Sequence, residues 1–514
     1  MNWKQKLFSS FTVAAILSMS AVAGAVEKKE NSKPNIVVIY VDDLGYGDLS
    51  CTGATGVQTP NVDKLAQNGI LFTDAHCSAA TCTPSRYSLL TGSYAFRKNA
   101  AVLQGDAPLL IEPGTPTLPS MLQQEGYKTA VIGKWHLGLG NGNVDWNGDV
   151  KPGPLEIGFD YSYLIPATGD RVPCVLLENH KVLGLDQNDP ITVSYDGMVG
   201  TDPTGTKNPD LLRYGADKQH SNTIVNGISR IGYMTGGNAA RWKDETIPFQ
   251  MLSKARSFID ENQETPFFLY FAFLDIHVPR LPALRFAGKS TMGVRGDAIV
   301  QMDYITGQLV DYLKSKGLLD NTLIVFSSDN GPVINDGYDD KAMELLGDHK
   351  PGGIYRGGKY SAYEAGTRVP TIAYWPNKIK GGQTSNALVG HVDLYASIAS
   401  LVNHELQDGE APDSFNQLET YLGTDNKGRA ELVEEAYTLS IREGKWKYIQ
   451  ATKNAGGWIK TEKNIESGLS TKAQLYNLED DPKELNNLAE SNPKLVVKLD
   501  AKLQKIKNET SSRK

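Results

Sequence analysis

Three strongly apolar segments, each ending abruptly in polar residues, limit most how this chain can fold. Residues 35–41, 267–276 and 322–326 are rich in β-branched and aromatic side chains and contain almost no charge. Uninterrupted apolar strands of this kind are typical of a sheet that is covered by helices on both faces. The polar residues that follow them would lie at the carboxyl edge of the sheet, where open α/β folds bind ligands. These residues are Asp42 and Asp43, His277, and Asp329 and Asn330.

Segments with helical patterns lie between these strands. Residues 62–68, 118–125 and 298–316 are each followed by a glycine, the residue that commonly ends a helix. Strands that alternate with helices predict an α/β fold with a large mixed, mainly parallel sheet sandwiched by helices. Residues 176–244 are instead rich in Gly, Asn, Asp and Thr with weak periodicity, and such a long irregular region usually has a function.

The pattern changes again near residue 382. Residues 436–450 alternate as in a hairpin with a Glu-Gly turn, and residues 493–506 are typical of an amphipathic helix. We therefore predict a large N-terminal domain over residues 26–381, which would carry the functional site. A smaller C-terminal α+β domain is predicted over residues 382–514.

The first 25 residues have the features of a secretory signal peptide. Two lysines, an apolar run over residues 11–22 and the small residues Ala23, Gly24 and Ala25 follow one another in that order. We predict cleavage near Ala25 and an exported protein that is periplasmic or secreted. An uncleaved anchor is the alternative, but the run contains serine and is shorter than the roughly 20 residues that a span needs. No stable membrane association is expected.

Composition argues against two other classes of protein. A formal net charge of −7 and a pI near 5.7 provide no basic surface of the kind that nucleic-acid backbones attract, so no nucleic-acid partner is expected. Four cysteines, Cys51, Cys77, Cys82 and Cys174, are too few for a disulfide scaffold. The sequence does not decide whether Cys51 and Cys77 form a disulfide.

Residues 82–86 (Cys-Thr-Pro-Ser-Arg), followed by Leu-Leu-Thr-Gly at residues 89–92, resemble the signature of the sulfatases. The resemblance extends from residue 35 to about residue 487 and implies the fold of the alkaline phosphatase superfamily. In this family the cysteine matching Cys82 is oxidised to formylglycine by a maturation enzyme before folding. The hydrated aldehyde supplies one hydroxyl to attack sulfur and a second whose deprotonation later expels sulfate. The alternative is a buried structural cysteine at a helix start.

The resemblance also implies a calcium site. Asp42, Asp43, Asp329, Asn330 and Cys82 match the positions around calcium in sulfatases, and oxygen atoms are the ligands that a hard divalent cation prefers. Taken alone, an Asp-Asp pair is more often a turn or a strand cap. Calcium would polarise the sulfate oxygens and lower the pKa of the nucleophile.

Two further catalytic positions lie close together in the sequence Gly-Lys-Trp-His-Leu-Gly. Lys134 and His136 follow a predicted strand over residues 129–132 and match the second sulfatase motif. The resemblance implies that Lys134 holds the sulfate and the formylglycine hydroxyl. His136 would remove the proton from the second hydroxyl, and Arg86 would orient the nucleophile.

The remaining catalytic matches lie at two other strand ends and loops. His277, followed by Pro279, would act as the general acid toward the leaving alcohol. Lys359 would contact the sulfate. Ala365 stands where sulfatases commonly have glycine, which weakens this local match slightly but leaves the lysine in place.

Three residues are predicted to contact the substrate. Thr168 aligns with a hydroxyl residue that contacts sulfate in some sulfatases, and Asp170 and Arg171 could bind sugar hydroxyls or a carboxylate. A salt bridge within the loop is the alternative for Asp170 and Arg171.

These matches predict a sulfuric ester hydrolase, most specifically an exo-acting carbohydrate sulfatase that removes sulfate from sulfated glycans with the help of calcium. Two alternatives remain. One is a phosphate or phosphonate monoester hydrolase of the same superfamily, and the other is a sulfated-glycan-binding protein whose Cys82 is never converted.

Overall fold

The structure, a computed structural model, describes residues 33–453 and 456–513 of the chain. The predicted signal peptide, residues 1–25, lies outside the described residues. Pro34–Lys514 form one compact unit. Among the helices of the described part, none is long and apolar enough to cross a membrane.

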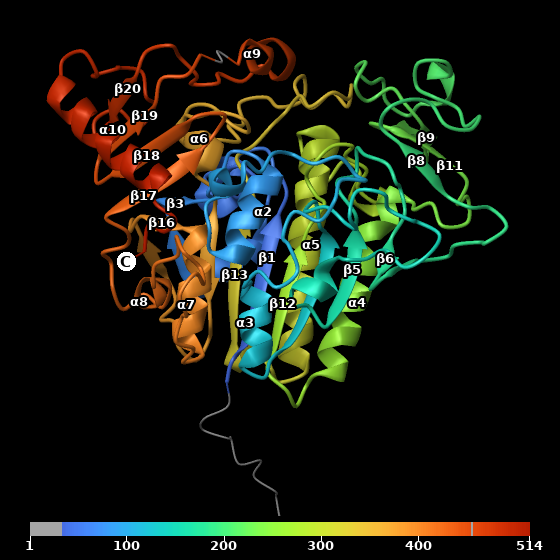
Figure 1. Cartoon of the computed structure of the whole chain (residues 1–514), viewed down its shortest axis with the longest axis horizontal. Coiled ribbons are helices and arrows are strands. Elements are labelled where there is room, and N and C mark those ends of the chain that lie inside the picture. The colour runs from blue at the N-terminus through green and yellow to red at the C-terminus, as the bar shows by residue number, and fades with distance from the viewer. Residues whose placement is uncertain (1–32, 454–455, 514) are drawn as a thin grey trace, which may run out of the picture. The chain divides into compact units, whose positions relative to one another are not determined.

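A mixed sheet of ten strands forms the centre of the molecule (Figure 1). Its five central strands are parallel, and antiparallel neighbours appear toward both edges. The predicted fold class, a mainly parallel sheet between helices, is therefore confirmed. In spatial order the strands are β15 (Gln383–Ser385), β2 (Ile70–Phe72), β14 (Thr371–Tyr374), β13 (Thr322–Ser328), β1 (Asn35–Val41), β12 (Phe267–Ala272), β4 (Lys128–Lys134), β5 (Tyr161–Ile165), β6 (Leu177–Glu178) and β7 (Lys181–Val182).

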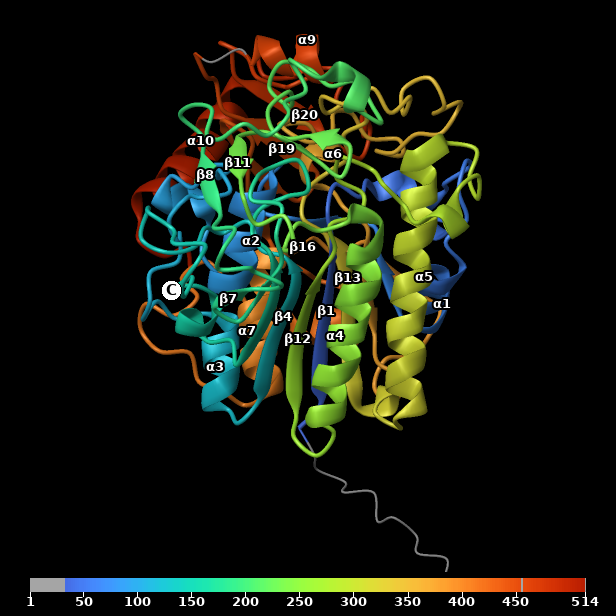
Figure 2. The ribbon, with the colours of Figure 1, turned by 90° about the vertical axis from the view of Figure 1, so that its right-hand side faces the viewer.

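Helices cover both faces of this sheet, and Figure 2 shows the two helical layers on either side of it. Every residue of β1, β12 and β13 is buried, which explains why these strands read as continuous apolar runs. One layer contains α1 (Pro60–Asn68), α4 (Ile247–Glu261) and α5 (Gly293–Ser315), and the other contains α2 (Cys82–Thr91), α3 (Leu118–Gln124) and α7 (Leu394–Leu401).

Two predicted boundaries differ from the structure by several residues. The strand expected over residues 267–276 ends at Ala272, because the chain then bends around the end of β1. The bend is held by backbone hydrogen bonds between Asp42 and the segment Asp275–Ile276. The helix expected to begin at residue 298 begins earlier, at Gly293.

A second, antiparallel sheet forms in the C-terminal part of the chain. Its strands are, in spatial order, β17 (Glu431–Glu435), β18 (Leu439–Glu443), β19 (Trp446–Ile449) and β20 (Gln474–Asn477). The helix α10 (Pro493–Asn508) packs against this sheet. The predicted hairpin and terminal helix are thus present. The division at residue 381 stays a prediction, and β15, just beyond it, still pairs with β2 of the large sheet.

The irregular stretch 176–244 forms small two-stranded pieces above the carboxyl edge of the large sheet (Figure 1). They are β8 (Thr192–Ser194) with β11 (Tyr233–Thr235), and β9 (Ile224–Val225) with β10 (Ile228–Ser229). The other short elements are β3 (Ala75–His76), β16 (Val389–Gly390), α6 (Glu364–Thr367), α8 (Leu418–Tyr421) and α9 (Gly457–Lys463). The four cysteines are unpaired, so Cys51 and Cys77 form no disulfide.

Candidate active site

Cys82 is the first residue of α2, one of the helices that cover the large sheet (Figure 1). Its side chain is buried, and the hydroxyl of the next residue, Thr83, donates a hydrogen bond of 2.9 Å to the carbonyl of His136. This bond fixes the start of the helix to the segment that follows β4. Burial raises the pKa of the Cys82 thiol, so the encoded side chain would stay protonated and be a weak nucleophile.

His136 directs one ring nitrogen at Cys82. Its Nδ1 lies 3.2 Å from the Cys82 sulfur, and its Nε2 lies 2.9 Å from the carbonyl oxygen of Leu103. Because that carbonyl can only accept, we place the proton on Nε2, which leaves Nδ1 as an acceptor facing residue 82. Burial and the nearby charge of Lys134 lower the pKa of His136 well below its ordinary value.

Three acidic side chains converge beneath Cys82, each paired with a cation. The Lys134 ammonium lies 2.6 Å from Asp42, and Lys359 lies 2.9 Å from Asp43. The third carboxylate, Asp329, accepts two hydrogen bonds of 2.9 and 2.7 Å from Arg86. All six of these side chains are buried: Asp42, Asp43, Arg86, Lys134, Asp329 and Lys359.

Burial and these ion pairs shift the pKa values of the side chains in the cluster. Burial raises the pKa of Asp42 above its ordinary value. Burial would also raise that of Asp329, but Arg86 and Lys134 lower it below the ordinary value. For Lys359, burial opposes the charge, yet Asp43 raises the pKa well above the usual range. Arg86 and Lys359 therefore keep their positive charges within the cluster.

The same cluster fits a divalent cation. Within the described residues, the Oδ1 atoms of Asp42 and Asn330 are buried and have no hydrogen-bond partner. Ligand atoms of Asp42, Asp43 and His277 lie within 4.8 Å of one another. Carboxylate and amide oxygens of this kind are the donors that hard divalent cations prefer, and an ion would satisfy the two unpartnered oxygens.

A cavity of about 410 Å³ opens onto Cys82. Of the predicted residues, Cys82, Asp170, Arg171, His277 and Lys359 line it. The other predicted catalytic and substrate residues are buried beside these and bonded to the cluster or the lining: Arg86, Lys134, His136 and Thr168. We call this space the catalytic cavity.

His277 presents its Nε2 to the acidic cluster, 3.8 Å from Asp43. Its Nδ1 lies 2.7 Å from the carbonyl oxygen of Val278, which can only accept, so the ring proton lies on Nδ1 and Nε2 is left as an acceptor. Burial and the charge of Lys359 lower the pKa of His277 to about 4.

The predicted substrate residues form one bonded group in the cavity wall. Arg171 donates to Thr168 at 3.0 Å and to Asp170 at 2.8 Å, and Thr168 also hydrogen-bonds Asp170. A salt bridge within the loop is thus present. Because Asp170 and Arg171 also line the catalytic cavity, this pair can form a salt bridge and still contact the substrate.

Several residues that line the cavity were not predicted from the sequence. His220 comes from the irregular stretch and lies between Asp217, at 2.7 Å, and Asp170, at 3.4 Å. Asp336 and Lys463 lie 2.7 Å apart, and Asp336 also approaches Lys359 at 3.4 Å.

An aromatic group completes the wall on the side of α9. Its rings belong to Tyr360, Tyr437 and Trp458, with Trp458 in edge contact with both tyrosines. Rings of this kind can pack against the apolar face of a sugar.

Comparison with known proteins agrees with this geometry. The sulfatase family profile matches residues 34–180 and 186–404. An N-acetylgalactosamine-6-O-sulfatase of Bacteroides thetaiotaomicron is 50% identical over 483 residues, which cover 93% of this chain and 94% of that protein. Human arylsulfatase A is 31% identical, over 88% of this chain and 83% of its own.

Solved structures give the same picture. A 6S-sulfatase from glycosaminoglycan metabolism in Bacteroides thetaiotaomicron superposes with a TM-score of 0.91 at 50% identity, covering 93% of this chain and all of that one. A Pseudoalteromonas sulfatase superposes with a TM-score of 0.67 at 27% identity, covering 94% and 92% of the two chains. This chain therefore belongs to the sulfatase family, whose members hydrolyse sulfate esters.

Proposed function

We propose that this sulfatase removes the 6-O-sulfate from an N-acetylgalactosamine, or a closely similar hexosamine, at the end of a glycan chain. The position of the sulfate and the type of sugar rest on the 50% identical N-acetylgalactosamine-6-O-sulfatase. Exo action is supported by the catalytic cavity, whose volume of about 410 Å³ suits a single sugar and its sulfate.

The proposed nucleophile is residue 82 after conversion. Formylglycine at this position would supply, as its hydrate, the hydroxyl that attacks sulfur and a second hydroxyl that allows the sulfate to leave. A maturation enzyme would have to act before folding, because the Cys82 side chain is buried in the folded chain. Conversion would lower the mass of the peptide that contains residue 82 by about 18 Da.

Three cations are assigned to the sulfate and its nucleophile. Lys134 is paired with Asp42 and Lys359 with Asp43 in the acidic cluster, and each would face an oxygen of the sulfate group. Arg86, fixed by its two bonds to Asp329, orients the cluster under residue 82. Prearranged charges of this kind stabilise the negative charge that develops on the oxygens during transfer.

Two histidines are assigned to proton transfer. Nδ1 of His136 is the acceptor facing residue 82, so His136 would take the proton whose loss releases sulfate. His277, which lines the cavity, would protonate the leaving sugar oxygen through Nε2, and for this the ring would first have to take up a second proton, because its low pKa leaves the free ring neutral. His136 would thus serve the hydroxyl at residue 82, and His277 would serve the leaving sugar oxygen.

Asp42, Asp43, Asp329 and Asn330 would hold the metal ion, with residue 82 beside it, and we propose calcium because these four side chains offer oxygen donors. A bound calcium ion supplies positive charge that polarises the sulfate and favours ionisation of the nucleophile. Export to the periplasm or the exterior is part of the same proposal and matches a glycan substrate.

The observation that carries this function is that Cys82, with His136 3.2 Å from its sulfur, and Lys359 line one sugar-sized cavity. Sulfate release should be measured on the 6-sulfates of N-acetylgalactosamine, N-acetylglucosamine and galactose, with N-acetylgalactosamine 4-sulfate and an aryl phosphate as controls. We expect the highest kcat/KM on N-acetylgalactosamine 6-sulfate. Preference for the 4-sulfate or for the phosphate would contradict the proposal.

A further inference from the structure

The chain just before residue 82 is bonded to two segments from distant parts of the sequence. The backbone N–H of Ala80 donates a hydrogen bond of 2.8 Å to the carbonyl of Glu435, the last residue of β17. The carbonyl of Ala80 accepts a bond of 2.8 Å from the N–H of Tyr360, which directly follows Lys359. Because Ala80 lies two positions before residue 82, β17 helps to set how residue 82 lies relative to Lys359.

A buried group of charged side chains holds both of these segments. Glu434, next to Glu435 in β17, lies 2.9 Å from Nδ1 of His76 and 3.0 Å from the ammonium of Lys447. Glu364, four positions after Tyr360, lies 3.0 Å from the same ammonium. We call the whole group the anchoring cluster. Its members, all buried except the partly exposed Asp74, are Asp74, His76, Glu364, Arg368, Glu434, Arg442, Lys447 and Glu484.

His76 has a carboxylate at each of its ring nitrogens. Nδ1 faces Glu434 at 2.9 Å, and Nε2 faces Asp74 at 2.9 Å. An ionised carboxylate can only accept hydrogen bonds, so both nitrogens can donate only when the ring is an imidazolium. Burial opposes this charge, but Glu434 and Asp74 raise the pKa of His76 above its ordinary value.

Other charged and titratable groups act on the same ring. Glu364 lies 3.9 Å from Nε2 and favours the charge, whereas the guanidinium of Arg442, 3.3 Å from Nε2, opposes it. His391 is a further neighbour, and burial lowers its pKa to about 3, so that it stays neutral. Glu484 accepts a bond of 2.6 Å from the N–H of Glu364, and burial raises its pKa to about 8. Glu484 therefore also changes charge above neutral pH and has to be separated from His76 by experiment.

Cations already pair with the carboxylates of this cluster. Ligand atoms of Asp74, His76 and Glu364 lie within 4.8 Å of one another, as they would around a metal ion. Arg368 lies 2.6 Å from Asp74, however, and Lys447 lies 3.0 Å from Glu364. These ion pairs favour an ionic cluster over a metal site at this place.

We propose that His76 is a positioning residue for sulfate transfer, whose imidazolium holds Glu434, and with it β17, against the chain that leads to residue 82. In this state residue 82 and Lys359 keep the separation that the reaction needs. When His76 loses its proton at higher pH, one of its two carboxylates is left without a donor and β17 is held less firmly. The protonated form is then the more active one. This inference rests on the proposed function, because it assumes the roles given there to residue 82 and Lys359.

A pH profile tests the charge on the ring. The carboxamide of His76→Gln is neutral at every pH. Below the pKa of His76 we expect kcat of the wild type to exceed that of His76→Gln by about tenfold, because a misplaced reacting group slows the chemical step. KM should stay within about twofold. The ratio of the two kcat values, each referred to the folded fraction, should fall toward one as the pH rises through the pKa of His76. Taking the ratio removes the titration of groups that both proteins share, such as His277.

Two further variants separate His76 from other titrating groups. Glu484→Gln is neutral at residue 484, so its kcat relative to His76→Gln should keep the pH dependence of the wild type. His404→Gln is the matched control, since His404 also lies between two carboxylates, Glu125 and Glu410, each 3.1 Å away, but on the loop after α7. It should leave kcat unchanged at every pH.

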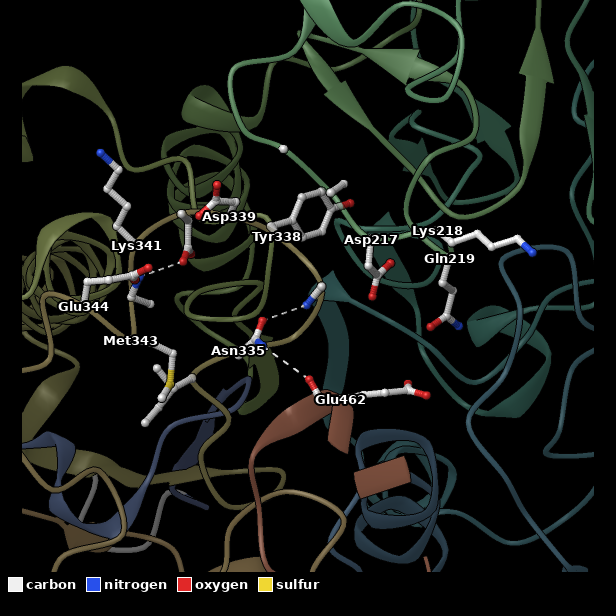
Figure 3. Close-up of a pocket in the computed structure, with 16 residues that line it drawn as sticks. Asp217, Lys218, Gln219, Asn335, Tyr338, Asp339, Lys341, Met343, Glu344 and Glu462 are labelled. Carbon is white, nitrogen blue, oxygen red and sulfur yellow. Dashed lines mark hydrogen bonds between the residues drawn. The ribbon is translucent and has the colours of Figure 1, made fainter. Parts of the chain in front are cut away.

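Glu434→Gln provides a second test should His76→Gln not fold. Loss of this carboxylate weakens the imidazolium, so kcat should begin to fall at a lower pH than in the wild type. Its control is Glu344→Gln. Glu344 is exposed and lines a neighbouring polar cavity of about 940 Å³ (Figure 3), outside the anchoring cluster. Glu344→Gln should keep the profile of the wild type.

The wild type separates the two proposals. If it releases no sulfate from N-acetylgalactosamine 6-sulfate, the proposed function fails. If it is active but the ratio of kcat to that of His76→Gln is the same at every pH, the charge of His76 has no part in positioning. A lower thermal midpoint of His76→Gln with unchanged kcat, or a wild-type profile in Glu434→Gln, would likewise overturn the inference.

Discussion

Nδ1 of His136 lies 3.2 Å from the sulfur of Cys82, while the opposite nitrogen of the same ring is tied to the carbonyl of Leu103. The ring is thus held in one orientation with its acceptor nitrogen facing the proposed nucleophile. A general base needs this combination of reach and fixed protonation.

Removal of this base should slow turnover without unfolding the protein. We expect His136→Ala to lower kcat by about 10²- to 10⁴-fold, the usual contribution of a positioned acid or base. Steady-state kinetics on the preferred sugar sulfate would measure the loss. His180→Ala provides the control, since the His180 side chain is partly exposed and pairs with Glu156. Equal activity of His136→Ala and the control would exclude the assigned role.

Metal removal should affect both activity and stability. Asp42, Asp43 and Asp329 lie together in the buried cluster, so an ion that binds only the folded state would stabilise it by about 2.7 kcal/mol at a hundred times its Kd. Dialysis against a chelator should lower the thermal midpoint and abolish turnover, and added calcium should restore both. An unchanged thermal midpoint and full activity in excess chelator would argue against the site.

Lys463 should act on the site through Asp336. Asp336 lies between Lys463, at 2.7 Å, and Lys359, at 3.4 Å, so loss of Lys463 leaves a buried carboxylate free to draw Lys359 away from the sulfate. We expect Lys463→Met to lower kcat/KM about tenfold, mainly through kcat, and Lys463→Arg to recover part of it. Lys460→Met, on the exposed side of the same helix, should leave kcat/KM unchanged. A purely structural role would lower the thermal midpoint and leave kcat of the folded fraction unchanged.

A buried ionic cluster between the large sheet and the C-terminal sheet should contribute to stability. Lys447 is fully buried and lies 3.0 Å from both Glu364 and Glu434. Lys447→Met would leave carboxylates buried without their cation, which typically costs about 3–5 kcal/mol. Thermal or chemical denaturation would measure the change. Lys445→Met, at a side chain that is 41% exposed, should alter stability by less than about 0.5 kcal/mol. A loss no larger than that of the control would contradict this account.

The sequence predicted the parts of this molecule that depend on local patterns. The strands β1 and β13 and the polar residues after them follow from a short apolar run that stops at a charge. Cys82 at the start of a helix follows from a short motif. By contrast, the end of β12 at Ala272 depends on hydrogen bonds to Asp42, far away in the chain, which no local pattern records.

The same reason explains which site residues the sequence missed. His220 and Asp336 lie in stretches without helical or strand periodicity, and Lys463 reaches the cavity from a short helix of the C-terminal part. Each gains its place by pairing with a residue distant in sequence, such as Asp170 for His220. Single-sequence patterns identify the chemistry common to sulfatases, whereas the walls that contact the sugar require the folded structure.

The central claim is that residue 82 carries out sulfate ester hydrolysis in this cavity. The most direct test is sulfate release from N-acetylgalactosamine 6-sulfate by the wild type and by Cys82→Ala, with circular dichroism to confirm that both are folded. We predict measurable turnover by the wild type and none above background by Cys82→Ala. Undiminished sulfate release by a folded Cys82→Ala would contradict the account.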